Sequence, residues 1–438
     1  MMQVVVVGGG PAGLACAVEL RRRGVGEVLV LEREATAGGI PRHSGHEGFG
    51  LRDLHRVMSG PRYARRYVEH ARRAGAEVFE ETTVTGWSAD GALEVTSPRG
   101  RDLLRPDALV LATGCRERPR AARLVPGSRP AESVLTTAEL QQLVFLHGKR
   151  LGGRALVVGA EHVSFSAVLT LAHAGARVAA MVTELPRHQS FAAFAAGARL
   201  RYRAPVWPRT AVAAIHGRSR VEEVELRDLD TGETRHVACD IVVFTADWIP
   251  DHELAVTAGL ELDPGTRGPR VDTGLRTGRE GVFAAGNVLH GAEPADVAAL
   301  GGIHTAASVA RWLGGGTGWP AALPIVCRSP LHWISPSAIG PLRDAPPRER
   351  FLLRSTAFLQ APVLEIRQAG RLLWSGRRRS LVPGRSAALP WAWIAEVDGS
   401  GGPMDVSVVT LNSKHGWSTL ARKRRRVSAP SVTRERRG

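Results

Sequence analysis

The chain has 438 residues and a formal net charge of +16, with 44% hydrophobic and 23% charged residues. This balance is ordinary for a globular protein, and the length exceeds what one simple core supports, so two or three domains are expected. No apolar run reaches the ~20 residues that span a bilayer and no secretory signal opens the chain, so we expect a cytoplasmic protein without a membrane span.

The first predicted elements are a strand, a glycine-rich turn, a helix and a second strand. Residues 3–7 are apolar enough for a buried strand, and Gly-Gly-Gly-Pro-Ala-Gly follows at residues 8–13. Apolar residues at helical spacing continue to Gly24, a natural helix stop, and residues 28–31 form the second strand. In this order of elements the glycine pattern predicts a dinucleotide-binding site.

The residues of this pattern have separate physical tasks. Gly8 allows the tight turn, Gly10 lets the backbone approach a pyrophosphate, and Gly13 lets the helix lie close to the strand. The helix N-terminus supplies free N–H groups and a partial positive charge to the phosphates. Glu32, at the end of the second strand, is placed to accept hydrogen bonds from ribose hydroxyls.

Later segments add a resemblance to a known family. Glu32 lies in the sequence Leu-Glu-Arg at residues 31–33, and Gly38-Gly39 follows it. Residues 107–114 are predicted to form a strand that ends in Ala-Thr-Gly, and residues 281–287 another short strand and turn. Together these features resemble the FAD-dependent pyridine nucleotide-disulfide oxidoreductases, flavoproteins with two dinucleotide-binding domains. The resemblance implies FAD in the first site and an α/β fold of the glutathione-reductase type, with two Rossmann-like domains, the second inserted in the first.

The resemblance also assigns the FAD-binding residues. They are Gly8, Gly10, Pro11, Ala12, Gly13, Glu32, Arg33, Gly39, Ile40, Val84, Ala112, Thr113, Gly114, Gly286 and Asn287. Asn287 stands where the family usually has an acid, but asparagine can still donate a hydrogen bond to a phosphate, so this departure is tolerated.

Cysteine usage separates this chain from disulfide reductases. The four cysteines, Cys16, Cys115, Cys239 and Cys327, are far apart, and no Cys-x-x-Cys occurs. The family's disulfide reductases hold their cysteine pair just after Gly-Gly, whereas residues 39–46 contain none. We therefore expect an oxidoreductase without a redox-active disulfide, and no metal site built from cysteine pairs.

A narrower resemblance comes from residues 38–64 and 114–120. These segments resemble flavoprotein subunits of multi-component dehydrogenases: anaerobic glycerol-3-phosphate dehydrogenase, opine oxidase, hydrogen cyanide synthase, sarcosine oxidase and dye-linked proline dehydrogenase. This likeness implies a partner flavoprotein, a small electron-transfer subunit, and a small amine, amino acid or hydroxy acid as the source of electrons.

The second nucleotide motif is damaged. Residues 156–164 lie where an NAD(P) motif belongs, and Gly159 is present, but Glu161 and Ser164 replace the next two glycines. A carboxylate at the point of closest approach would repel a pyrophosphate. We expect a retained fold with weakened or lost NAD(P) binding, while an unusual working site stays open as the alternative.

Three residues after Gly39 are candidates for catalysis. His43 and His46 could take a proton beside the flavin, because the pKa of histidine lies near physiological pH, and Arg42 could hold a substrate carboxylate. The alternatives are histidines bonded to backbone and an arginine paired with a surface acid. A later helix is expected to start after Gly301-Gly302, with His304 near its beginning.

The predicted organisation has five segments. Residues 1–118 and 245–325 form the FAD-binding domain, 119–244 the inserted NAD(P)-binding-like domain, 326–421 a C-terminal β-rich domain, and 422–438 a basic disordered tail. The tail could hold nucleic acid or an acidic partner, but a solvated tail is favoured and nucleic acid is unlikely to be bound.

Three functions remain in view. The leading one is an FAD-dependent dehydrogenase or electron-transfer subunit. The alternatives are an NAD(P)H-dependent reductase of a small acceptor and a non-catalytic FAD-containing subunit that binds a partner. The sequence does not identify the substrate or the electron acceptor.

Overall fold

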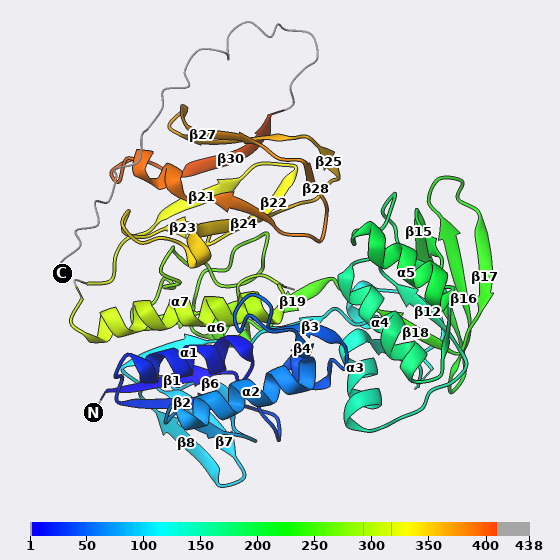
Figure 1. Cartoon of the computed structure of the whole chain (residues 1–438), viewed down its shortest axis with the longest axis horizontal. Coiled ribbons are helices and arrows are strands. Elements are labelled where there is room, and N and C mark those ends of the chain that lie inside the picture. The colour runs from blue at the N-terminus through cyan, green and yellow to red at the C-terminus, as the bar shows by residue number, and fades with distance from the viewer. Residues whose placement is uncertain (1, 131, 292, 317, 410–438) are drawn as a thin grey trace, which may run out of the picture.

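The first sheet of the computed structural model is parallel and has the strand order β20-β9-β1-β2-β5 (Figure 1). The structure describes residues 2–130, 132–291, 293–316 and 318–409. The strands of this sheet are β1 (Gln3–Val7), β2 (Glu27–Leu31), β5 (Glu77–Phe79), β9 (Ala108–Leu111) and β20 (Val282–Ala284). The sheet therefore joins the start of the chain to a segment that follows an inserted domain.

The two faces of this sheet are covered differently. Val4 and Val6 pack with the helices on one face, whereas Val5 and Val7 pack against a small antiparallel sheet on the other. This alternation is the period of two that a buried strand imposes. The covering elements are α1 (Pro11–Arg22), α2 (Gly60–Arg73), α7 (Ala295–Leu313), β6 (Thr83–Trp87), β7 (Leu93–Ser97) and β8 (Gly100–Leu104).

Helices α1 and α7 approach closely because a glycine lies at their contact. A Cβ at Gly302 would lie 2.0 Å from the carbonyl oxygen of Ala12. The predicted start of this helix was wrong: α7 begins at Ala295 and runs through Gly301 and Gly302. Packing against α1 outweighs the low helix propensity of the two glycines, so His304 lies in the middle of the helix.

The inserted domain has its own parallel sheet, with the order β11-β18-β12-β13-β14. An antiparallel sheet and three helices complete it, and strands β10 and β19 connect it to the first domain (Figure 1). Its parallel strands are β11 (Val134–Thr136), β12 (Arg154–Val158), β13 (Arg177–Val182), β14 (Val206–Trp207) and β18 (Ile241–Phe244). The other elements are β10 (Cys115–Glu117), β15 (Thr210–Gly217), β16 (Val221–Asp228), β17 (Thr234–Ala238), β19 (Trp248–Pro250), α3 (Thr137–Gln141), α4 (His162–His173) and α5 (Ala192–Tyr202). Two Rossmann-like units, the second inserted in the first, confirm the predicted fold class.

The C-terminal region is built of strands, as predicted, and begins at Leu323, slightly before the expected boundary. Its main sheet has the order β23-β21-β30-β26-β27 and packs around Ile325, Leu353, Leu364 and Trp393. The strands are β21 (Leu323–Cys327), β22 (Leu331–Ser335), β23 (Ala338–Ile339), β24 (Arg350–Ser355), β25 (Leu359–Gln360), β26 (Val363–Gln368), β27 (Arg371–Arg377), β28 (Ser380–Leu381), β29 (Ala387–Pro390) and β30 (Met404–Val409).

Short elements complete the described chain. They are β3 (Glu47–Phe49), β4 (Met58–Ser59), α6 (Glu253–Thr257), the π-helical η3 (Gln142–Leu146) and the 3-10 turns η1 (Ile40–His43), η2 (Ala121–Arg123), η4 (Gly286–Val288), η5 (Pro347–Glu349) and η6 (Ala392–Glu396). The predicted basic tail at 422–438 lies outside the described residues. Within the described part of the chain, none of the helices has the length and apolar composition of a bilayer span.

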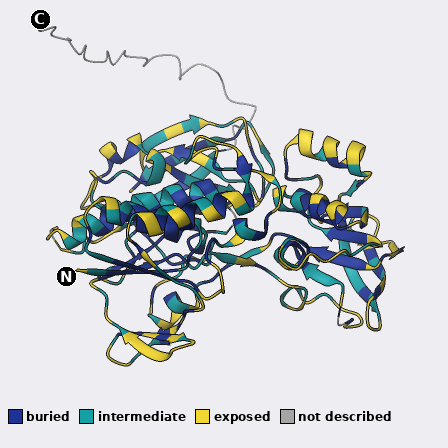
Figure 2. Ribbon diagram, turned by 60° about the horizontal axis from the view of Figure 1, so that its bottom comes forward, coloured by how far each residue is buried: buried dark blue, intermediate teal, exposed yellow. Residues whose placement is uncertain are grey.

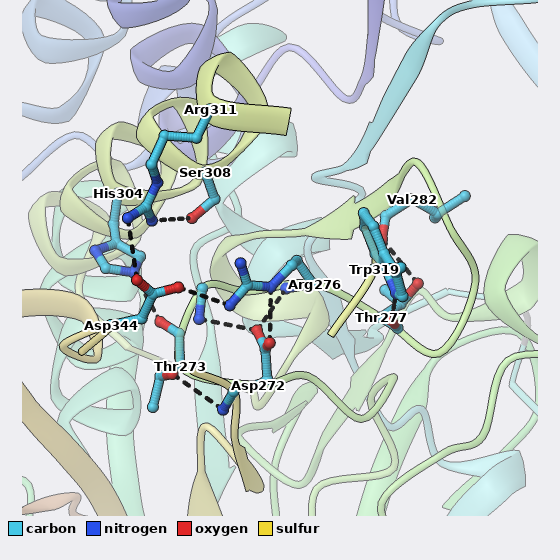
Figure 3. Close-up of polar contacts among 12 residues, drawn as sticks. Asp272, Thr273, Arg276, Thr277, Val282, His304, Ser308, Arg311, Trp319 and Asp344 are labelled. Carbon is cyan, nitrogen blue, oxygen red and sulfur yellow. Dashed lines mark hydrogen bonds and ion pairs between the residues drawn. The ribbon is translucent and has the colours of Figure 1, made fainter. Parts of the chain in front are cut away.

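A partly buried ionic network fixes the C-terminal region on α7 (Figure 3). Asp344 accepts a hydrogen bond from Arg276 at 2.8 Å and from Arg311 of α7 at 3.1 Å. Arg276 also donates to Asp272 at 2.7 Å, and His304 bonds to the carbonyl oxygen of Thr273 at 2.8 Å. His304 therefore helps to hold α7 against the segment that contains Thr273.

Candidate functional site

A cavity of about 910 Å³ lies at the carboxyl ends of β1 and β9, enclosed by the first domain, the inserted domain and the C-terminal region. In parallel α/β sheets ligands bind at this edge of the strands. Most residues assigned to FAD line it: Gly8, Gly10, Pro11, Ala12, Glu32, Arg33, Gly39, Ile40, Val84, Ala112, Thr113, Gly114 and Asn287. Gly13 and Gly286 lie behind this wall.

The glycine turn has the geometry of a phosphate cradle. A Cβ at Gly8, whose φ is +112°, would lie 2.4 Å from the carbonyl oxygen of Ala112. A Cβ at Gly13 would lie 2.0 Å from the carbonyl oxygen of Gly8. At Gly10 the nearest atom to such a Cβ is the Cα of Gly39 at 3.9 Å, so this position is open to the cavity. Gly8 and Gly13 thus shape the turn, whereas Gly10 leaves room for a ligand.

Glu32 is held rigidly at the end of β2. Its carboxylate accepts hydrogen bonds from the backbone N–H groups of Gly9 and Glu34, each at 2.9 Å. Burial raises the pKa of Glu32, and the two backbone hydrogen bonds act in the opposite direction. A carboxylate has about four lone-pair sites, so Glu32 keeps acceptor capacity for ribose hydroxyls.

Several polar groups that line the cavity are paired with one another. Arg33 forms an ion pair with Asp251 at 3.3 Å, and Thr113 donates to the carbonyl oxygen of Asp251 at 2.6 Å. Asn287 and Glu293 exchange two hydrogen bonds of 3.2 Å, side chain to backbone in both directions. Asn287 therefore shapes the turn before α7 in addition to facing the cavity.

The N-terminus of α7 also borders the cavity. Ala295 and Ala298, in its first turns, line the wall. The helix dipole places a partial positive charge at this end. Asp296 is turned away and accepts hydrogen bonds from Arg52, the shortest at 3.0 Å. The arrangement favours negative charge on a ligand at this end of the cavity.

His43 is the catalytic candidate that the structure brings to the cavity. It is buried in η1, and burial lowers its pKa to about 4. Its ring lies beside Gln141 of α3, and its Nδ1 atom is buried with no hydrogen-bond partner among the described residues. The pKa of His43 therefore does not lie near physiological pH, contrary to the prediction from the sequence. The imidazole is desolvated and stays neutral at pH 7.

Arg42 and His46 lie outside the cavity wall. Arg42 forms an ion pair with Glu34 and donates to the carbonyl oxygen of Thr36. His46 lies with Nδ1 2.9 Å from the carbonyl oxygen of Glu47 and stacks on Phe49. Both side chains are occupied by local partners, so substrate contact by either one stays a hypothesis.

The C-terminal region supplies a wall that sequence reasoning missed. Trp333, Arg354 and Arg385 face the cavity from loops and strands of this region. Arg354 lies over the ring of Trp333 at 5.1 Å and forms an ion pair with Glu293 at 3.4 Å. No motif marks these residues, and only the three-dimensional placement of the C-terminal sheets shows their role.

The second nucleotide turn is closed by its own carboxylate. Glu161 caps the N-terminus of α4, where its side chain accepts hydrogen bonds from the backbone and the hydroxyl of Ser164. Burial raises the pKa of Glu161. The carboxylate therefore takes up the backbone N–H of Ser164, one of the groups that would otherwise bind a phosphate.

A C-terminal loop covers the same turn. Gln189 donates to the carbonyl oxygen of Pro383 at 3.3 Å. A Cβ at Gly384 would lie 2.9 Å from Nε2 of Gln189 and 3.4 Å from Cγ of Glu161. This loop therefore packs beside the N-terminus of α4, whose residues Glu161, His162 and Val163 also line the cavity.

Comparison with known proteins identifies relatives over most of the chain. A model of the family described as pyridine nucleotide-disulphide oxidoreductase matches residues 2–302. Thioredoxin reductase from Treponema pallidum (strain Nichols) is 29% identical over 293 residues, 65% of this chain and 88% of that protein. One of the subunits of opine oxidase from Rhizobium meliloti is 26% identical over 402 residues, 82% of this chain and 68% of that protein. The solved thioredoxin reductase of T. acidophilum shares the fold, with a TM-score of 0.60 at 23% identity over 71% of this chain and 98% of that chain.

Proposed function

Because the chain belongs to the pyridine nucleotide-disulphide oxidoreductase family, whose flavoproteins bind FAD, we propose that it is a dehydrogenase or electron-transfer subunit that works without a nicotinamide dinucleotide. Its electrons come from a small amine, amino acid or hydroxy acid, or from a partner flavoprotein. The observation that carries this proposal is the second turn, where the Glu161 carboxylate caps the N-terminus of α4 at the point where a phosphate would bind.

The first site fits FAD. Backbone N–H groups of the glycine turn would hold the pyrophosphate, Glu32 would hold the ribose, and the open position at Gly10 would admit the phosphates. Bound FAD supplies a ring that accepts a pair of electrons. The N-terminus of α7 would favour negative charge on that ring.

His43 is proposed to position a ligand. With a pKa of about 4 it stays neutral near pH 7, so it is a poor proton acceptor but a good hydrogen-bond partner. Its buried Nδ1 atom, without a partner among the described residues, is the group that a ligand would satisfy. Gln141 fixes the ring from the other domain.

Two features support a reaction without disulfide chemistry. Residues 39–46 contain no cysteine, and the four cysteines are far apart in the sequence, with no Cys-x-x-Cys among them. A dithiol relay needs two neighbouring thiols to form and release a mixed disulfide. The similarity to reductases therefore supports the fold and the cofactor. This chain does not have the pair of neighbouring cysteines that disulfide reduction requires.

The narrower resemblance supports a role within a multi-component dehydrogenase. The similarity to the opine oxidase protein extends over 402 residues, beyond the matched family model and into the C-terminal region. That region supplies Trp333 and Arg354 to the cavity wall. We propose that the C-terminal sheets shape the space in which the electron donor meets the flavin.

The second candidate function is an NAD(P)H-dependent reductase. Its support is the similarity to thioredoxin reductase. It requires a dinucleotide to displace the loop at Pro383 and Gly384 and to lie beside the carboxylate of Glu161 in the cavity wall. Burying a like charge without a partner costs several kcal/mol, which disfavours this function.

Calorimetric titration with NADPH and with NADH separates the two functions. The wild-type protein is expected to bind neither dinucleotide, while Glu161→Gly, which frees the α4 N-terminus, gains measurable affinity. The exposed residue Glu132 provides a control, Glu132→Gly, which should bind neither. Tight binding by the wild type, little changed in Glu161→Gly, would overturn the proposal.

A further inference from the structure

Helix α5 of the inserted domain carries large apolar side chains that face solvent. Phe191, just before the helix, is 50% exposed, and Phe194 and Leu200 on it are 54% and 82% exposed. The helix is the mostly exposed one at the upper right of Figure 2. We refer to these three residues as the α5 patch.

The composition of α5 is that of a covered helix. Residues 192–198 are only alanine, phenylalanine and glycine, yet Ala198 alone among them is buried. The rings of Phe191 and Phe194 lie 6.2 Å apart and form a local exposed apolar surface, and such a surface marks an interaction site. The α5 patch therefore indicates a surface that is covered in the working assembly.

The surroundings of the patch are positively charged. No aspartate or glutamate occurs from residue 185 to residue 221. Arg199, Arg201 and Arg203 lie at the end of α5, and none of them forms an ion pair with a described residue. A second copy of this chain would bring arginines against arginines, so charge complementarity selects an acidic occupant.

The patch is continuous with the cavity. The ring of His162 lies 4.8 Å from that of Phe191 and 5.6 Å from that of Phe194. The guanidinium of Arg385 lies 4.2 Å from the centre of the Phe191 ring. His162 and Arg385 both line the cavity wall. A protein bound to the α5 patch would therefore lie directly behind His162 and Arg385 of the cavity wall.

We propose that the α5 patch docks an acidic one-electron carrier protein, which accepts the electrons that leave the cavity. The inference rests on the proposed function, because it names the electron acceptor of that same site. Each carrier accepts one electron, so two carriers reoxidise one fully reduced flavin, and one proton passes to solvent from the anionic reduced ring that the α7 N-terminus favours. The position of the patch beside the cavity wall favours a carrier protein over a lipid surface.

The test uses two small acidic carriers, a ferredoxin and a flavodoxin, with the FAD-loaded protein. The wild-type protein should bind at least one of them at low ionic strength, and binding should weaken as salt is added because the charges are screened. Phe191→Asp/Phe194→Asp should weaken binding about tenfold or more, since apolar anchors dominate such interfaces. Leu200→Asp, at a position that packs against little, should also weaken it.

Leu103→Asp is the matched control, because Leu103 is 48% exposed on β8 and lies outside the patch. It should bind the carrier as the wild type does. Reduced wild-type protein should also pass electrons to the carrier, and the double variant should do so about tenfold more slowly at subsaturating carrier concentrations.

Two readouts separate this inference from the proposed function. Flavin content and reoxidation of the reduced protein by ferricyanide, a small acceptor, should be the same in all variants. Loss of either would count against the proposed function rather than against the docking site.

Four results would overturn the docking site. They are no binding of either carrier by the wild type at low salt, equal binding by the patch variants, patch-dependent binding to vesicles of anionic phosphatidylglycerol, and a dimer in sedimentation that the patch variants dissociate.

Discussion

Gly10 is the residue at which the cofactor site can be tested without disturbing the fold. A Cβ there would meet no protein atom closer than 3.9 Å, and it would project into the cavity. The neighbouring glycines differ, since a Cβ at Gly8 or Gly13 would clash with backbone oxygen. A methyl group at Gly10 therefore acts on the ligand alone.

We predict that Gly10→Ala lowers FAD affinity roughly tenfold or more, about 1.4 kcal/mol, because the methyl group occupies the space of the pyrophosphate. Thermal unfolding of the flavin-free protein should stay unchanged. Quenching of flavin fluorescence during titration measures the affinity. Gly197→Ala, at a helical glycine with open surroundings, is the control and should bind FAD normally. Equal affinity of Gly10→Ala and wild type would contradict the proposed cradle.

The role of a residue can be predicted well from the sequence where that role depends on local structure. The tasks of Gly8, Gly10 and Gly13 follow from one strand, one turn and one helix, and the structure has the corresponding close approaches. The side-chain directions of Arg42 and His46 could not be read in this way. They depend on Glu34 and on the fold of a short loop, which no periodic pattern encodes.

At the scale of elements, the contact between α1 and α7 holds the first domain together. Gly302 lies directly against the backbone of α1, whereas Gly301, its neighbour in the same helix, meets only the backbone nitrogen of Gly286 at 3.8 Å. The two positions have the same helical conformation and differ only in their surroundings. They provide a matched pair for measuring how close packing contributes to stability.

Gly302→Ala should lower the free energy of unfolding by about 2 kcal/mol, because the added methyl group forces the helices apart. Gly301→Ala should be neutral or stabilising by up to about 1 kcal/mol, since alanine has the higher helix propensity. Urea unfolding of both variants measures the difference. If the two variants were equally stable, the close approach of α7 to α1 would be incorrect.

The start of α7 shows why element boundaries were harder to predict than element types. Two adjacent glycines at 301 and 302 indicate a helix start by propensity alone. The helix nevertheless begins at Ala295. Gly302 lies inside it because the close contact with α1 leaves no room for a side chain at that position. Tertiary packing explains the glycine, and one sequence cannot distinguish the two causes.

At the scale of the whole molecule, three parts of the chain enclose one cavity. The Rossmann units were predictable because each follows a repeated order of strand, turn and helix. The wall at Trp333 and Arg354, and the loop at Gly384 over Glu161, were not, because they join residues far apart in the sequence. The loss of two glycines from the second motif was visible in the sequence. The loop at Gly384 that packs beside this motif could be recognised only in the structure.

The central claim is that electrons reach the flavin without a nicotinamide dinucleotide, and anaerobic reduction tests it most directly. NADH or NADPH is added in excess to the FAD-loaded protein, and the visible absorbance of the flavin is followed. The account predicts that the band persists for minutes with either dinucleotide and is lost on addition of dithionite. Loss of the band within seconds of adding NADH or NADPH would contradict it.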